Sequence, residues 1–150
     1  MYTGPLWAEI AGTIWENLTL SNPDADLSQI NALAEQTGLS AYLSTLPKGY
    51  ETYLDPTGKR LPRNVVQKIL LVRALANNPA LLLLEEPWSG IEEKNKKPIQ
   101  DMLLKDLQAT TILVATNDPV FLRQADKIIY LTGEGCRIVD GREPSLFPES

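Results

Sequence analysis

Two adjacent carboxylates, Glu85 and Glu86, follow directly on an unbroken apolar run at residues 81–84, and Pro87 comes next. Such a run is typical of a strand buried in a parallel sheet, and residues leaving the carboxyl end of that strand line the crevice where α/β proteins bind ligands. One interpretation gives Glu85 a role linked to Mg²⁺ and gives Glu86 the orientation of an attacking water. The other interpretation places both acids in a solvated turn before the next helix. The dipeptide alone favours the solvated turn.

Composition limits the chemistry that these acids could share. The chain has 150 residues and no histidine, which excludes zinc, haem or triad chemistry that depends on imidazole. A formal net charge of −5 argues against general binding to nucleic acid or to acidic membranes. The single cysteine, Cys136, cannot close an intrachain disulfide, which is typical of a reducing, cytosolic setting. We expect Cys136 to be a small core residue.

The elements that must position the acids follow from apolar periodicity. Apolar runs at 81–84, 111–115 and 127–131 predict three strands of a mainly parallel sheet, and a stretch around 137–139 predicts an added edge strand. Helical spacing predicts a helix from Asp26 that Gly38 ends, a short helix at 41–45, a helix of about fifteen residues with Pro62 in its first turn, and helices at 93–107 and 119–124. Residues 1–20 are expected to form loop and short extended pieces, and residues 48–60 an irregular loop. The alternation predicts an α/β fold.

Five segments resemble the nucleotide-binding domain of exporter-type ATP-binding cassette (ABC) transporters, in the same order and at similar spacing from about residue 10 to residue 141. Residues 12–18 resemble G-T-I-x-E-N-I, residues 46–52 resemble L-P-x-G-Y-D-T, residues 67–75 resemble Q-R-I-A-L-A-R-A-L, residues 82–92 resemble the Walker B strand and D-loop L-L-L-D-E-x-x-S-x-L-D, and residues 125–139 resemble A-D-K-I…D-G-R-I-V. The resemblance implies a partial P-loop NTPase (ABC ATPase) fold. Because the phosphate-binding motif G-x-x-x-x-G-K-S/T has no counterpart here, the expected fold lacks the first strands and the phosphate loop.

The resemblance assigns roles to individual positions. Glu86 stands where the family has its catalytic glutamate, and Glu85 replaces the Walker B aspartate that holds Mg²⁺ through water. The extra methylene of Glu85 moves its carboxylate by roughly a bond length, which disturbs a demanding octahedral shell. Ser89 and Glu92 match the D-loop, which crosses the dimer interface in the family. Asn117 stands in place of the H-loop histidine, and an amide cannot reproduce imidazole proton chemistry.

The signature loop L-S-G-G-Q falls on five residues that depart from it: Leu61, Pro62, Arg63, Asn64 and Val65. Its chemistry needs free N–H donors and small residues at close approach to a phosphate. Pro62 removes a hydroxyl and a donor, while Arg63 and Asn64 replace both glycines with larger groups. We expect the signature to be non-functional. The Q-loop glutamine has no counterpart in residues 1–10, and Pro56 stands where the family carries a glutamate that contacts its transmembrane partner.

The resemblance also implies an organisation and a setting. We expect a helical subdomain at about 18–75, a sheet-containing core at about 79–141 and a frayed tail at 142–150. ATP and Mg²⁺ are the implied cofactors in a full-length context, although the chain alone should not bind them tightly. The implied partners are a second ABC ATPase domain and the transmembrane domain of a transporter, with no nucleic acid. The implied location is cytoplasmic, on the inner face of a membrane through that transmembrane partner.

Three functional hypotheses follow. The first is an ABC transporter ATP-binding domain, as a fragment or a reduced relative, that takes part in ATP-driven transport as a degenerate half-site, with a chain that is inactive as an ATPase when alone. The second is a non-catalytic regulatory or docking module that has lost nucleotide binding. The third, weaker, is a self-contained binding protein without nucleotide.

Overall fold

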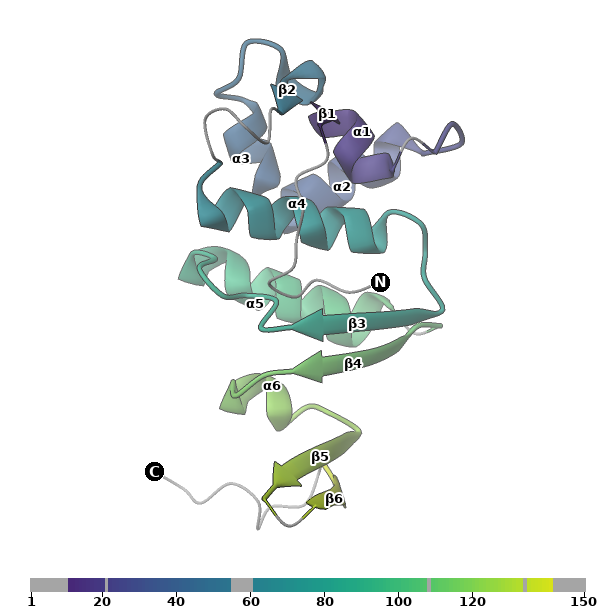
Figure 1. Ribbon diagram of the computed structural model, residues 1–150, viewed down its shortest axis with the longest axis vertical. Coiled ribbons are helices and arrows are strands. Elements are labelled where there is room, and N and C mark those ends of the chain that lie inside the picture. Colours follow the sequence, from purple (N-terminus) through teal and green to yellow (C-terminus); the bar gives the residue numbers. More distant parts are fainter. Residues whose placement is uncertain (1–10, 21, 55–60, 108, 134, 142–150) are drawn as a thin grey trace. The chain divides into compact units, whose positions relative to one another are not determined.

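The computed structural model describes residues 11–20, 22–54, 61–107, 109–133 and 135–141. The chain divides into two compact units, Met1–Ala115 and Thr116–Ser150, and each is described by itself. Both helices and strands are present, as the mixed α/β prediction requires. The first unit contains β1 (Gly12–Thr13), α1 (Ile14–Thr19), α2 (Leu27–Gln36), α3 (Leu39–Leu43), a 3₁₀ turn (Gly49–Glu51), β2 (Tyr53–Leu54), α4 (Arg63–Leu75), β3 (Leu81–Glu85), α5 (Glu93–Asp101), a π-helical turn (Met102–Asp106) and β4 (Thr111–Ala115) (Figure 1).

Helix α4 is the centre of the first unit. Ten of its 13 residues are buried, and α1, α2 and α3 all contact it. Figure 1 shows these three helices on one side of α4, with α5 and β3 on the other. The predicted helix is confirmed, with one difference: Pro62 is the residue before the first turn, where its extended backbone (ψ 141°) directs the chain into the helix. Asn78, at a φ of 46°, lies in the turn that follows.

Helix α1 lies where the sequence was expected to form loop and extended pieces, so that prediction is wrong for Ile14–Thr19. Its cause is a capping box. The Thr13 hydroxyl accepts a hydrogen bond from the Glu16 N–H at 3.1 Å, and the Glu16 carboxylate accepts one from the Thr13 N–H at 2.7 Å. Two N–H groups that a helix start leaves unpaired are thereby satisfied. The Thr-x-x-Glu spacing is legible in the sequence and predicts this start.

Helix α3 begins two residues earlier than predicted and ends at Leu43 rather than at residue 45. Gly38 ends α2 as expected, in a left-handed conformation with a φ of 74°, and α3 starts directly after it. Ser44 and Thr45 then turn their hydroxyls back onto the Ala41 and Tyr42 carbonyls. Such local side-chain bonds compete with continuation of a helix, which explains the earlier end.

Strands β3 and β4 form a parallel pair in register from Leu81 opposite Thr111 to Glu85 opposite Ala115. The parallel pairing is as predicted, but burial on both faces is not. Leu82 and Leu84 are buried, whereas Leu81 is 49% exposed on the other face. Because side chains alternate along a strand and helices cover one face, the second face of this two-stranded sheet stays open within the described residues.

Among the described strands, the third predicted strand pairs with neither β3 nor β4, which corrects the prediction of one hydrogen-bonded sheet. In the second unit, β5 (Lys127–Thr132) pairs with β6 (Gly135–Asp140) in an antiparallel hairpin that follows the short helix α6 (Pro119–Leu122). Two residues separate β5 from β6 in the sequence, so local pairing is the short-range alternative to a long-range parallel one. The hairpin confirms a strand around 137–139, paired with β5 alone among the described strands.

Cys136 is exposed, so its prediction as a core residue is wrong. It pairs across the hairpin with Leu131, while Ile128 and Val139 form the buried pair on the opposite face. A strand residue is buried only if its own face is covered, and sequence alternation alone does not say which face that is.

Helix α5 and the π-helical turn after it carry the predicted apolar face: Ile99 is buried in α5, and Met102 and Leu103 are buried in the turn. The helical path ends at Asp106 and changes from α to π geometry at Met102. Within the described part of the chain, no helix combines the length and the apolar character needed to span a membrane. The division into a helical subdomain (18–75), a sheet-containing core (79–141) and a tail (142–150) stays a prediction.

Candidate functional site

The two acids lie where β3 ends. Glu85 is the last residue of β3 and is exposed, and Glu86 is half-buried. The Glu86 N–H donates to the Ala115 carbonyl at 2.9 Å, which extends the pairing with β4 by one bond. At a φ of 41°, Glu86 then turns the chain through a left-handed conformation that glycine adopts far more readily. Non-glycine residues held in this region are concentrated at functional sites, because surrounding structure must enforce them.

Residues 86–92, called the acidic loop below, form a hydrogen-bonded turn. The Ser89 N–H donates to the Glu86 carbonyl at 2.9 Å, and the Ile91 N–H donates to the Trp88 carbonyl at 3.0 Å. Trp88 and Ile91 are buried, and Gly90 takes the left-handed conformation between them. Trp88 packs in the protein, so the loop backbone is anchored at its middle.

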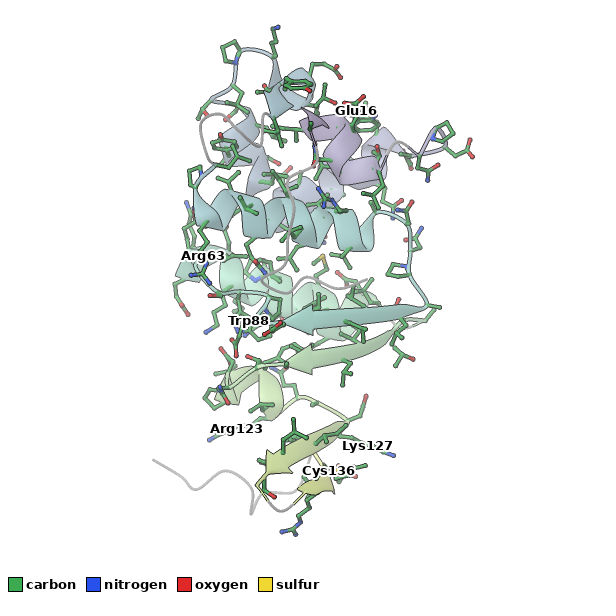
Figure 2. All side chains as sticks on the ribbon, in the orientation of Figure 1. Glu16, Arg63, Trp88, Arg123, Lys127 and Cys136 are labelled. Atoms are coloured by element: carbon green, nitrogen blue, oxygen red, sulfur yellow. The ribbon has the colours of Figure 1, made fainter. Side chains whose placement is uncertain are left out.

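The five signature positions span the start of α4. Leu61 and Asn64 are half-buried, Pro62 and Arg63 are exposed, and Val65 is buried. The N–H groups of Val65 and Val66 both donate to the Pro62 carbonyl, at 2.9 and 3.1 Å. Figure 2 shows Arg63 at this start of α4 and Trp88 in the acidic loop, at the same end of the first unit. The start of α4 and the carboxyl end of β3 therefore share one edge.

Glu92 joins these two segments. One carboxylate oxygen accepts from the Asn64 amide at 2.8 Å, and the other lies 2.8 Å from the Lys68 ammonium and accepts from the Asn95 amide at 3.0 Å. The hydrogen bond from Lys68, followed by the carboxylate's own backbone N–H, lowers the pKa of Glu92 to about 2. Glu92 is therefore ionised at neutral pH and fully engaged inside its own chain.

Gln67 makes the second link between α4 and the acidic loop. Its side-chain amide donates to the Pro87 carbonyl at 3.0 Å in a part-buried position. Neither Gln67 nor Lys68 was among the predicted site residues. Their spacing from Asn64, at i+3 and i+4, puts all three on one helix face, which is the signal that could have found them.

The remaining predicted positions are placed less closely. Ser89 is half-buried and its N–H is used within the acidic loop. Asn117 is exposed and follows the end of β4, in the second unit. Pro56, at the family's glutamate position, and residues 1–10, where the resemblance places the glutamine, lie outside the described residues.

A magnesium ion fits this edge only in part. Mg²⁺ in nucleotide sites is held by one or two carboxylates, by water and by substrate phosphates. Glu85 and Glu86 supply carboxylates, but the described residues contain no group of three or more acidic or thiol side chains that could hold a metal ion. The remaining ligands would have to come from phosphate and water.

The known proteins that resemble this chain in sequence and in fold come from one family. No protein-family model matches the chain. Its sequence is 32% identical over 136 residues to Multidrug resistance protein homolog 65 of Drosophila melanogaster, covering 91% of this chain and 10% of that protein. It is 32% identical over 140 residues to ABC transporter B family member 1 of Arabidopsis thaliana, covering 93% of this chain and 11% of that protein.

The fold agrees with that similarity. The structure of a bacterial Atm1-family ABC exporter with ATP bound superposes with a TM-score of 0.75 at 20% sequence identity, covering 85% of this chain and 23% of that one. This likeness concerns the fold alone. The chain spans about a tenth of the length of the two curated relatives.

Proposed function

Since this chain is homologous to exporter-type ABC transporters along about nine tenths of its length, we propose that it forms the C-terminal part of an ATP-binding domain that takes part in ATP-driven transport as a degenerate half-site. The observation that carries the proposal is Glu86, held in a left-handed turn where a parallel strand ends and beside the start of α4. This is the crevice edge where α/β proteins bind ligands.

In this proposal Glu86 orients the water that attacks the terminal phosphate. Glu85 contacts Mg²⁺ through water, and ATP with Mg²⁺ binds only where another segment supplies the phosphate loop. Half-burial of Glu86 and its fixed backbone support this role, because a positioned carboxylate needs a rigid frame. Asn117 would donate a hydrogen bond at most, and Ser89 with Glu92 would mark the side facing a second domain.

The half-site is proposed to be degenerate because of the start of α4. Pro62 has no N–H to offer a phosphate, and Arg63 and Asn64 carry side chains where close approach needs small residues. The N–H groups of Val65 and Val66 are turned onto the Pro62 carbonyl. The partners implied by the homology are a second ABC domain and a transmembrane domain, which would place the chain on the cytoplasmic face of a membrane.

One observation favours the alternative, a non-catalytic regulatory or docking module. Asn64 and Glu92, two of the predicted interface positions, satisfy each other at 2.8 Å inside the same chain. A ligand or second domain would have to displace that bond before using either group. The alternative keeps the fold and gives up nucleotide.

Two measurements separate these functions. Sequencing the gene ahead of the Met1 codon should show an open frame that encodes a phosphate loop, whereas an in-frame stop close to Met1 would contradict the transport proposal. In the protein that carries this loop, Glu86→Gln should reduce ATP hydrolysis by about 10²-fold or more, since general-base assistance contributes that much. Glu93→Gln, at the exposed first turn of α5, is the matched control. If hydrolysis is absent before either change, the docking module is the better proposal.

A further inference from the structure

One face of α4 holds the acidic loop at both of its ends. Asn64 and Lys68 bind the two carboxylate oxygens of Glu92 at 2.8 Å each, and Gln67 binds the Pro87 carbonyl at 3.0 Å. These three donors recur at i, i+3 and i+4, so a single helix face presents them together. The loop that carries Glu86 is thereby fixed to α4 through its backbone at one end and through Glu92 at the other.

Lys68 contacts several of these segments at once. Its side chain is 5% exposed, and its ammonium contacts the Gly38 carbonyl at 3.3 Å as well as Glu92. Asn95, which also binds Glu92, packs so closely on Gly38 that an added Cβ would lie 2.5 Å from its amide nitrogen. The junction of α2 and α3, the first turns of α4 and the start of α5 therefore meet around one ammonium group.

The buried charge of Lys68 favours keeping Glu92, and with it the acidic loop, against α4. An ammonium removed from water needs a countercharge and further hydrogen-bond acceptors. Glu92 supplies the countercharge and Gly38 supplies the further acceptor. If the acidic loop moved away from α4, Glu92 would go with it and Lys68 would keep only a carbonyl. Motion of the loop relative to α4 is thus opposed by the desolvation of the ammonium.

The geometry points to Lys68 as a positioning residue that ties the acidic loop to the start of α4, so that the two segments move as one body. Any partner that displaces the first turn of α4 would carry the Glu86 backbone with it. Only the use made of Glu86 rests on the proposed function. The mechanical link does not, and it can be tested without nucleotide.

Trp88 provides a reporter inside the acidic loop. In a Trp7→Phe, Trp15→Phe background it is the one remaining tryptophan, because the sequence contains three. Lys68→Met keeps most of the stem and removes the charge. We expect red-shifted Trp88 emission, stronger acrylamide quenching, and amide exchange of Ser89 and Ile91 about tenfold faster, since a hydrogen bond to a charged group is lost. Lys68→Arg should restore the parent values.

Two controls separate positioning from general destabilisation. Lys105→Met removes an exposed ion pair with Asp101 on α5 and the following turn, and should leave Trp88 unchanged. Ile14→Val weakens the core in α1 without touching the loop, and should lower the unfolding midpoint without shifting native Trp88 emission. If Lys68→Met does not fold, Glu92→Gln removes the countercharge with an amide of the same shape and should give the same local changes. Unchanged loop exchange and emission in the folded Lys68 or Glu92 variant would overturn the inference.

Discussion

Helix α4 and the β5–β6 hairpin use apolar residues in opposite ways. Along α4 nearly every side chain is buried, including Lys68 and Arg73, and three other helices pack on it. Among the described residues of the hairpin, Ile128 and Val139 alone are buried, while Leu131 is 84% exposed. A two-stranded hairpin with one covered face is marginal on its own, whereas a helix contacted on several sides holds a core. The number of apolar residues in an element therefore does not indicate how much they stabilise the fold. Their contribution depends on how many other elements cover them.

The sharpest test of this contrast is one substitution made in both places. Leu71→Ala, in the fully buried middle of α4, should lower the free energy of unfolding by about 2–5 kcal/mol because it leaves a cavity. Leu131→Ala, in the hairpin, should change it by less than about 0.5 kcal/mol. Urea unfolding followed by circular dichroism measures both. Equal losses would break the comparison.

The next largest effect concerns the buried guanidinium of α4. Arg73 donates to the Asn17 carbonyl at 2.6 Å and to the Asn17 side-chain oxygen at 2.7 Å, near the end of α1, and burial lowers the pKa of Arg73. Arg73→Met should cost about 1.5–3 kcal/mol, because the Asn17 acceptors lose a charged donor. Arg137→Met in the exposed strand β6 should cost far less. Thermal unfolding of both variants decides whether buried polar contacts, besides apolar ones, separate the two regions.

A smaller effect is expected at the glycine that α4 packs against. Gly38→Ala places a side chain at a φ of 74° and against the Asn95 amide, so it should cost about 1–2 kcal/mol from backbone strain alone, and more from the clash. Gly49→Ala meets no atom within 4 Å at a φ of 47° and should show the strain alone. The difference between the two unfolding free energies measures the packing around Lys68. No difference would mean that the cluster is loose.

The smallest effect is a pH dependence. Because Lys68 holds the pKa of Glu92 at about 2, below its ordinary 4.5, the folded state binds fewer protons there than the unfolded state. Its contribution to stability is complete above about pH 4.5 and is lost as the pH falls toward 2. Glu92→Gln should flatten the acid limb of a plot of urea midpoint against pH. Since Glu92 is 41% exposed, the change should be modest. Parallel curves would contradict the ionised pair.

Local sequence patterns predicted where helices and strands form better than they predicted which faces of those elements are buried. The apolar spacing of Val65, Ile69 and Val72 predicts α4 because a helix repeats every 3.6 residues. The capping box at Thr13 and Glu16 is equally local, because the Thr-x-x-Glu spacing alone indicates the start of α1. The predicted burial of Cys136 is wrong because the alternation of side chains along a strand does not say which face other elements cover.

At the candidate site, too, local features were predictable from the sequence and long-range contacts were not. That Glu85 and Glu86 follow a strand is legible from residues 81–84. Helix spacing places Asn64 and Lys68 on one face of α4, but it does not say what that face contacts. Their binding of Glu92 joins segments far apart in the chain and is set by how α4 packs on the start of α5. The left-handed turn at Glu86 is likewise imposed by its surroundings, since a glutamate does not favour it.

At residue 86, the backbone conformation that best suits the fold and the side chain that supplies a carboxylate are in conflict. Glycine at residue 86 would adopt this backbone at no steric cost, and asparagine would tolerate it better than glutamate, so selection for a well-folded chain alone would favour either one. Glutamate keeps a carboxylate at the strand end and leaves the molecule less stable than its own architecture would allow.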